Sequence, residues 1–152
     1  MIVFGAKYLI VLIPLLALAA WLQAGNRLKK QMLLAAVAAV ILAVILDKIA
    51  GKLYYDPRPF VSHHLKPLVA HTADNGFPSE HTLFGTTLAV LIYIYRSRIG
   101  TVALATALVV GIARVAAHIH SPIDIIGGVA IGIAAGFGGY AVARRLLPPK
   151  SD

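Results

Sequence analysis

Polar residues capable of acid, base or nucleophilic chemistry interrupt this largely apolar chain in three short groups. Together they supply imidazoles, fixed cations, a hydroxyl and a carboxylate, which is the set that phosphoryl transfer through a histidine nucleophile requires. One imidazole can attack phosphorus, a second can move a proton, and the cations can neutralise the phosphate oxygens. The groups are Lys52 with Arg58, Ser79 with His81, and Arg114 with His120 and Asp124.

The third group contains a histidine that immediately precedes a predicted helix start. Ser121, Pro122 and Asp124 are of the types favoured at the N-cap, at the first helical position and three residues after the cap. Asp124 can therefore serve as the carboxylate of a capping box. It can also accept a hydrogen bond from one nitrogen of His120, which leaves the other nitrogen free to attack phosphorus. The two interpretations are compatible.

Arg114 lies in an apolar stretch, upstream of His120. An arginine at the centre of a membrane helix costs roughly 2.5–3.5 kcal/mol on insertion scales, so a partner is expected. Either its long side chain reaches the membrane surface, or its planar guanidinium binds two oxygens of a phosphate. His118 has no aspartate four residues later, so we favour a structural or interfacial role for it.

The second group predicts another helix start, because Ser79 and His81 precede an apolar run. Ser79 is then an N-cap residue, but a helix amino terminus also offers free backbone N–H groups to an anion. His81 is a candidate for protonating a leaving oxygen.

The first group closes an apolar stretch. Lys52 and Arg58 are either interfacial cations accompanied by Tyr54 and Tyr55, or phosphate ligands. Prolines on both sides of Arg58 end the helix and hold the arginine on an extended segment, which favours placement of its charge.

The elements that must position these groups are membrane helices. Of the 152 residues 59% are hydrophobic and 13% are charged, and the mean hydropathy is +0.83. We therefore expect an all-α, polytopic membrane bundle that forms a single domain over residues 1–152, with no cysteine available for disulfides or thiol chemistry. The net charge of +8 sits in small groups between apolar stretches, which argues against nucleic-acid binding. About five spans are expected, over residues 2–24, 31–46, 82–95, 100–113 and 123–143.

The cations between spans predict the orientation. The positive-inside rule places the connections after the first and third spans, and the carboxyl terminus, in the cytoplasm. The polar groups then share the outer face with the amino terminus, since connections two helices apart emerge on the same side. A signal peptide cleaved after Ala17-Leu18-Ala19 is the alternative for the first span, but it would leave basic residues at a translocated terminus. The proposed cytoplasmic cations are Arg27, Lys29, Lys30, Arg96, Arg98, Arg144, Arg145 and Lys150.

Two further features leave alternatives open. Loop residues 61–77 carry His63, His64, Lys66 and His71, for which a lid, a head-group contact or simple solvation is favoured over metal binding. Small residues at Gly128, Gly132 and Gly136 favour close helix packing, within the bundle rather than between protomers, although a homodimer remains open.

The order and spacing of the three groups resemble the signature of the type 2 phosphatidic acid phosphatase superfamily. Within that superfamily, this short chain with its Arg58-Pro59-Phe60 run is most similar to the bacitracin-resistance type of undecaprenyl-diphosphate phosphatases. Glu80 occupies a place often held by glycine or aspartate, so its carboxylate must point away from the phosphate or influence His81. The spacing is Lys52-x5-Arg58-Pro59, Pro78-Ser79-x-His81 and Arg114-x5-His120-x3-Asp124.

The resemblance implies a two-step displacement. His120 would form a phosphohistidine with Asp124 orienting it, and His81 would protonate the leaving oxygen and then activate water. The implied phosphate ligands are Lys52, Arg58, Ser79 and Arg114, with neither a cofactor nor a metal ion implied.

The implied substrate is undecaprenyl diphosphate, hydrolysed at the outer face of a bacterial plasma membrane so that the cell-wall carrier lipid is recycled. Phosphatidylglycerophosphate or phosphatidic acid is the alternative substrate. A non-enzymatic lipid-binding protein or a transporter is a further alternative. It is disfavoured because His81, His120 and Asp124 are all present and no inverted repeat is visible.

Overall fold

The computed structural model describes residues 1–148, and its regular elements are helices; the only β pairing in this part of the chain is an isolated bridge between Pro57 and Asn75. The all-α prediction is therefore confirmed. The elements are α1 (Ile2–Lys7), the 3-10 turn η1 (Leu9–Val11), α2 (Leu12–Leu22), α3 (Asn26–Leu53), α4 (Pro59–Ser62), α5 (Glu80–Tyr95), α6 (Ser97–Ala116) and α7 (Pro122–Leu146).

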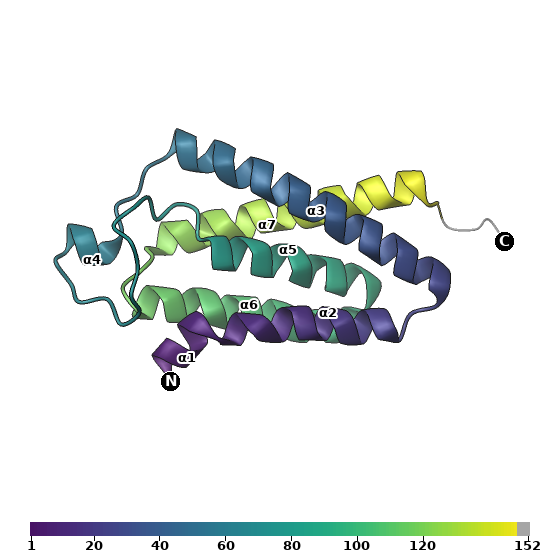
Figure 1. Ribbon diagram of the computed structural model, residues 1–152, viewed down its shortest axis with the longest axis horizontal. Coiled ribbons are helices and arrows are strands. Elements are labelled where there is room, and N and C mark those ends of the chain that lie inside the picture. Colours follow the sequence, from purple (N-terminus) through teal and green to yellow (C-terminus); the bar gives the residue numbers. More distant parts are fainter. Residues whose placement is uncertain (149–152) are drawn as a thin grey trace.

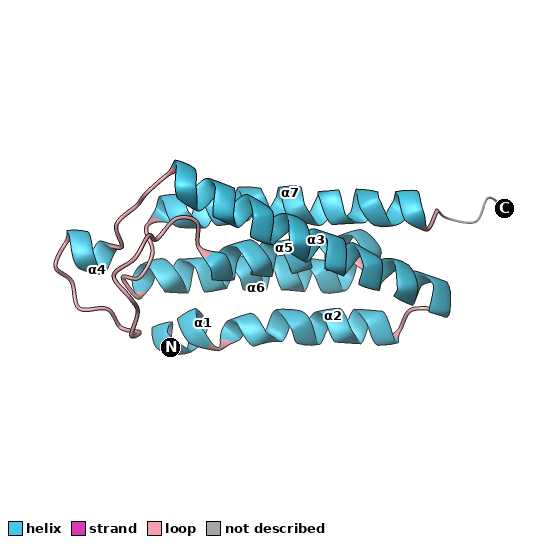
Figure 2. Cartoon of the chain, turned by 45° about the horizontal axis from the view of Figure 1, so that its top comes forward, coloured by secondary structure: helices cyan, strands magenta, loops and turns pink. Residues whose placement is uncertain are grey.

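The long helices lie side by side in one bundle with α5 at its centre (Figure 1). Helix α5 packs against both α6 and α7, and α3 packs mainly on α7. Helices α1 and α2 run along the outside of the bundle next to α6 and α5 (Figure 2). Because α2 barely touches α3, these two helices close one side of the bundle only loosely.

Within residues 1–148, three helices are long and apolar enough to cross a membrane, namely α3, α6 and α7. Helix α5 has 16 residues, which is short for a membrane span. It is packed between the longer helices α3, α6 and α7. The first apolar stretch, expected as one span over residues 2–24, is divided into α1, η1 and α2. Pro14 explains the division, because proline is tolerated in the first turn of a helix but not in its interior. The number of spans stays a prediction.

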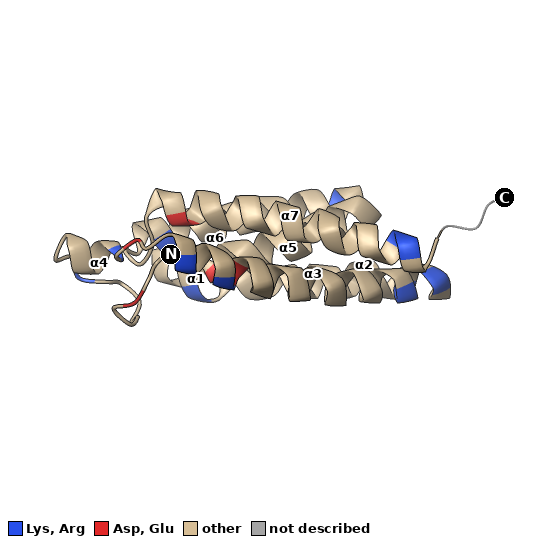
Figure 3. Ribbon diagram, turned by 90° about the horizontal axis from the view of Figure 1, so that it is seen from above, with Lys and Arg blue, Asp and Glu red and all other residues tan. Residues whose placement is uncertain are grey.

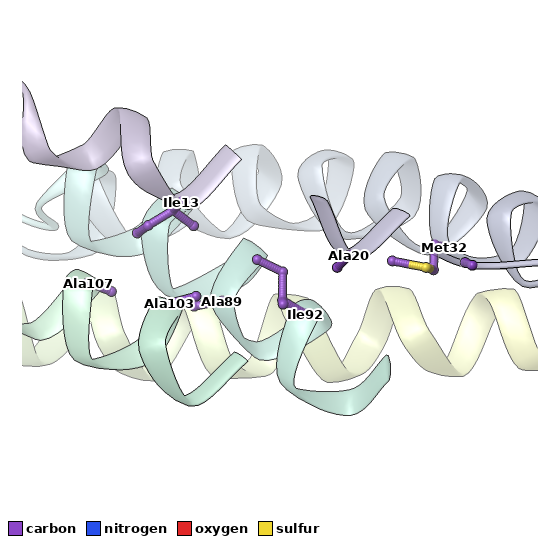
Figure 4. Packing of buried hydrophobic residues seen from close by; sticks show 8 residues of the cluster. Ile13, Ala20, Met32, Ala89, Ile92, Ala103 and Ala107 are labelled. Carbon is purple, nitrogen blue, oxygen red and sulfur yellow. The ribbon is translucent and has the colours of Figure 1, made fainter. Parts of the chain in front are cut away.

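The interior of the bundle is built from small residues, which let the helices approach closely. Figure 4 shows one buried cluster in which alanines from α2, α5 and α6 interlock with three larger side chains. Its labelled members are Ile13, Ala20, Met32, Ala89, Ile92, Ala103 and Ala107.

Gly128, Gly132 and Gly136 of α7 face α5, as the intramolecular interpretation predicted. A Cβ atom on Gly128 would lie 2.9 Å from the carbonyl oxygen of Ser79. One on Gly132 would lie 2.6 Å from the carbonyl oxygen of Leu83, and one on Gly136 would lie 2.8 Å from the Val90 side chain. The two backbones therefore meet at a distance that excludes any side chain, and this contact fixes the start of α5 against the start of α7.

Charges are divided between the two ends of the bundle (Figure 3). The connections from α3 to α5 and from α6 to α7 lie at one end with the amino terminus, and the α2–α3 and α5–α6 connections lie at the other (Figure 1). Arg27 and Arg96 hold the second end together by donating to the carbonyl oxygens of Pro148 and Gln23. Seven of the eight cations expected in the cytoplasm belong to this second end, and Lys150 lies outside the described residues.

Gly132→Ala should destabilise the bundle by about 1–3 kcal/mol, because the new methyl group overlaps backbone atoms of α5 that have no room to move. Gly138→Ala is the matched control: its Cβ meets only the end of the flexible Leu42 side chain, so the usual helix gain of roughly 0.5–1 kcal/mol should be kept. Unfolding of the two variants in the same detergent measures the difference. Equal stabilities would contradict the close contact between α5 and α7.

Candidate active site

A cavity of about 490 Å³ opens at the end of the bundle where the polar groups meet. Five of the seven predicted site residues line it, and they come from all three sequence groups. These five are Lys52, Arg58, His81, Arg114 and His120. Asp124 lies behind His120 and is completely buried, while Ser79 lies beneath the cavity and is also completely buried. The fold thus brings the three groups together at one end of the bundle, as we predicted from the rule that connections two helices apart emerge on the same side.

His120 and Asp124 form a buried pair at the start of α7. His120 Nδ1 lies 3.0 Å from Asp124 Oδ2, and the same oxygen accepts the backbone N–H of Ser121 at 2.9 Å. Ser121 is the N-cap residue and Pro122 the first residue of the helix. The carboxylate therefore caps the helix and orients the histidine at the same time.

The other nitrogen of His120 faces two guanidinium groups. His120 Nε2 lies 3.3 Å from Arg58 Nη1 and 3.2 Å from Arg114 Nη2. Guanidinium nitrogens only donate hydrogen bonds, so Nε2 must be the acceptor and Nδ1 must carry the proton that Asp124 binds. This tautomer leaves the Nε2 lone pair directed into the cavity, which is the form that a nucleophile requires.

The arginines are themselves buried and held from several sides. Arg58 is 7% exposed and Arg114 is 3% exposed. Arg58 Nη1 also donates to the carbonyl oxygen of Ile119 at 2.8 Å, and Arg114 Nη1 donates to that of Ala6 at 3.1 Å. Of the two interpretations of Arg114, the structure therefore favours a guanidinium directed to the site over one that reaches for the membrane surface.

His81 and Ser79 lie at the start of α5, as predicted, with Ser79 at the N-cap. His81 lines the same cavity as His120, so the two imidazoles share one compartment. Ser79 makes two hydrogen bonds within the protein: its N–H donates to the carbonyl oxygen of Asp124 at 3.1 Å, and its hydroxyl oxygen accepts from Thr82 at 3.2 Å. A role for Ser79 as a phosphate ligand stays a prediction.

The cavity contains residues that sequence reasoning did not assign. Asp74 lines the cavity and its Oδ1 lies 2.7 Å from Nε of Arg58. Asp56, outside the cavity lining, accepts a hydrogen bond from the hydroxyl of Ser121. Asp47 also lines the cavity, and so does Glu80, whose carboxylate we expected either to point away from the phosphate or to influence His81. The only signal in the sequence was the concentration of these acids near the three groups.

Among the loop histidines, only His71 lines the cavity; His63 and His64 do not. Its Nε2 lies 3.3 Å from Arg114 Nη2, and its ring centroid lies 6.2 Å from that of His120. The prediction of a head-group contact in this loop therefore narrows to a single residue.

Asn75 fixes the loop that carries these residues to the end of α3. Its side-chain oxygen accepts the N–H groups of Asp56 and Phe77 at 2.9 and 3.0 Å. Its side-chain nitrogen donates to the carbonyl oxygens of Gly51 and Tyr54, both at 3.0 Å, and so satisfies the exposed end of the helix.

Comparison with known proteins gives one consistent family. The family model of the PAP2 superfamily matches residues 32–147. Undecaprenyl-diphosphatase BcrC of Bacillus subtilis is 31% identical over 146 residues, which cover 96% of this chain and 75% of that protein.

Two crystal structures resemble the fold. LpxE of Aquifex aeolicus has a TM-score of 0.65 at 25% identity, covering 92% of this chain and 81% of that one. A transmembrane PAP2 type phosphatidylglycerolphosphate phosphatase from Bacillus subtilis has a TM-score of 0.62 at 20% identity, covering 98% of this chain and 76% of that one.

Burial sets the protonation of the two imidazoles that face the arginines. Burial lowers the pKa of His120, and the two guanidinium groups add to this effect, while the hydrogen bond to Asp124 opposes it. Burial and the same two arginines also lower the pKa of His71. Both rings are therefore neutral at pH 7, which keeps the Nε2 lone pair of His120 available.

The folded protein should lose stability as the pH falls below about 6.5, the ordinary pKa of histidine. Below that value the unfolded chain binds protons that buried His120 rejects, and that His71 rejects beside Arg58 and Arg114, so acid favours unfolding. Thermal unfolding in detergent between pH 7.5 and pH 5 measures this slope. His120→Gln should flatten it, whereas His63→Gln, a change at an exposed loop position, should leave it unchanged. A slope unaffected by His120→Gln would show that the ring is not buried neutral.

Proposed function

The chain belongs to the PAP2 superfamily, and on that premise we propose that it is a membrane lipid phosphatase that hydrolyses undecaprenyl diphosphate to undecaprenyl monophosphate. The observation that carries this proposal is the environment of His120, whose Nδ1 is held by Asp124 and whose Nε2 faces the guanidinium groups of Arg58 and Arg114. The nucleophilic atom, Nε2 of His120, then lies beside two guanidinium groups that can bind phosphate.

In the first step, Nε2 of His120 attacks the terminal phosphorus. A nitrogen–phosphorus bond forms, the bond from phosphorus to the bridging oxygen breaks, and its electron pair leaves with the lipid monophosphate. In the substrate-free protein, N–H groups of Arg58 and Arg114 point at Nε2. When the substrate binds, they donate their hydrogen bonds to the phosphoryl oxygens instead and stabilise the charge that develops there. His81 donates a proton to the leaving oxygen and so becomes the neutral base of the second step, and Lys52 at the cavity wall supports the phosphate of the departing lipid.

In the second step, His81 takes a proton from a water molecule, and the resulting hydroxide attacks the phosphohistidine. The nitrogen–phosphorus bond breaks, inorganic phosphate leaves, and His120 regains its lone pair. The ring carries a positive charge while it is phosphorylated, and the buried carboxylate of Asp124 stabilises that charge through Nδ1.

A lipid substrate fits a cavity at the end of a membrane bundle. This is a membrane protein: three helices are long and apolar enough to cross a bilayer, and its relatives include a transmembrane PAP2 type phosphatase. We propose five spans in a bacterial plasma membrane, with the amino terminus outside and the carboxyl terminus inside. The site then faces outward, where removal of a phosphate recycles the cell-wall carrier lipid and contributes to bacitracin resistance.

The purified protein should release phosphate fastest from undecaprenyl diphosphate in a panel that also contains phosphatidylglycerophosphate and phosphatidic acid. His120→Ala should abolish this release while the protein stays folded, because no other group replaces the nucleophile. His118→Asn is the control, since His118 comes from the same segment, has a positive φ of 62° that asparagine tolerates, and does not line the cavity.

Each other ranking points to a different function. Faster release from phosphatidylglycerophosphate or phosphatidic acid would make the protein a phospholipid phosphatase. No release from any member of the panel would favour a lipid-binding or transport protein.

The orientation can be measured with single cysteines, because the natural chain contains none. Ala70→Cys, in the loop at the site end, should react with a membrane-impermeant thiol reagent in intact cells. Lys30→Cys, at the start of α3, should be protected until the cells are opened. The reverse pattern would place the site in the cytoplasm and remove the carrier-recycling proposal.

A further inference from the structure

One short loop segment, residues 71–75, contacts both phosphate-binding arginines. Nε2 of His71 lies 3.3 Å from Nη2 of Arg114, and Oδ1 of Asp74 lies 2.7 Å from Nε of Arg58. The carbonyl oxygen of Asn75 accepts a further hydrogen bond from Arg58 at 3.4 Å. Neither His71 nor Asp74 belongs to the three groups that carry the family resemblance.

We propose that His71 and Asp74 are positioning residues, which hold the guanidinium groups of Arg114 and Arg58 in the orientation that binds the transferred phosphoryl group.

His71 helps to fix the orientation of Arg114. Its guanidinium has three acceptors on different elements, the carbonyl oxygen of Ala6 in α1, His120 and His71. When a phosphoryl group displaces the contact to His120, only Ala6 and His71 remain to define the plane of the fork. Arginine cannot accept hydrogen bonds, so His71 must offer its Nε2 lone pair.

Asp74 orients Arg58 in the same way, because it accepts a hydrogen bond from the guanidinium group. It also forms an ion pair with it. The Arg58 side chain is 8% exposed and that of Asp74 is 58% exposed, so the carboxylate holds a buried cation from the solvent side. Thr72 donates to the other carboxylate oxygen at 2.7 Å. This bond and the one from Arg58 lower the pKa of Asp74, so the carboxylate stays ionised. Its negative charge also reduces the repulsion between two guanidinium groups that share one histidine nitrogen.

The segment is rigid enough for this role because Asn75 ties it to α3. Its four hydrogen bonds reach Gly51, Tyr54, Asp56 and Phe77. The loop is therefore fixed relative to α3, the helix that precedes Arg58. This also fixes the positions of His71 and Asp74 relative to Arg58.

The inference rests on the proposed function only for the identity of the bound group, so its test measures binding of inorganic phosphate rather than turnover. The affinity of the purified protein is read from the rise of its Tm with phosphate concentration. His71→Leu removes the acceptor, whereas His71→Asn keeps a side-chain oxygen that can accept from Arg114. His63→Leu is the matched control, because it makes the same change at an exposed position of the same loop.

We expect His71→Leu to weaken phosphate binding by about tenfold or more, the range for a lost hydrogen bond to a charged group. His71→Asn should recover most of the affinity, and His63→Leu should bind as the unaltered protein does. Asp74→Ala should weaken binding likewise, with Asp74→Asn in between because an amide oxygen accepts without a charge. If the leucine variant fails to fold, His71→Gly replaces it as the variant without an acceptor. Its phosphate affinity is then compared with that of His71→Asn, provided that the two variants have the same Tm without phosphate.

Unchanged phosphate affinity in His71→Leu and Asp74→Ala would overturn the proposal. So would equal losses in the leucine and asparagine variants, which would indicate a role in packing. Phosphate binding that follows the expected order in a protein without turnover on any lipid would instead contradict the proposed function and leave the positioning role standing.

Discussion

The structure depends on the way the two nitrogens of His120 are held. Asp124 binds the proton on Nδ1, and the guanidinium groups of Arg58 and Arg114 point at the lone pair on Nε2. One carboxylate and two cations thus select a single tautomer, in which the lone pair of Nε2 faces both guanidinium groups. Under the function proposed above, the substrate-free site is arranged in advance for a phosphoryl group, because phosphoryl transfer depends mainly on positioning and on stabilisation of charge.

The fold makes this arrangement possible inside an apolar bundle. Burying Asp124, Arg58 and Arg114 costs several kcal/mol per charge unless each is paired and hydrogen-bonded. The close approach of α5 to α7 at Gly128 and Gly132 brings the starts of these helices together, so that helix ends and loop backbone supply the partners. The carbonyl oxygens of Ala6 and Ile119, from distant parts of the sequence, complete the arginine contacts. The cavity is thus lined by the ends of helices and by the loop that precedes α5.

The local part of this site could be predicted from the sequence, and the nonlocal part could not. The bond between His120 and Asp124 follows from a helix cap, which is encoded within a few neighbouring residues. The meeting of the three groups follows from counting apolar stretches. The partners of Arg58 and Arg114 in the loop and in α1 have no such signal, since the packing of the loop and of α1 on the bundle brings together residues that are 16, 43 and 108 positions apart. The same limit applies to Ser79, whose hydroxyl is covered by packing that its cap position does not reveal, and to the first apolar stretch, which Pro14 divides.

The most direct measurement of the central claim is to identify the phosphorylated residue. The protein is mixed with undecaprenyl diphosphate, quenched rapidly in alkali, where phosphohistidine survives, and analysed by mass spectrometry of its peptides. Our account predicts a phosphoryl group on His120 that accumulates in a His81→Ala variant, because the second step then lacks its base. A phosphoryl group on another residue, or turnover through direct attack of water with no phosphorylated protein in either form, would contradict it.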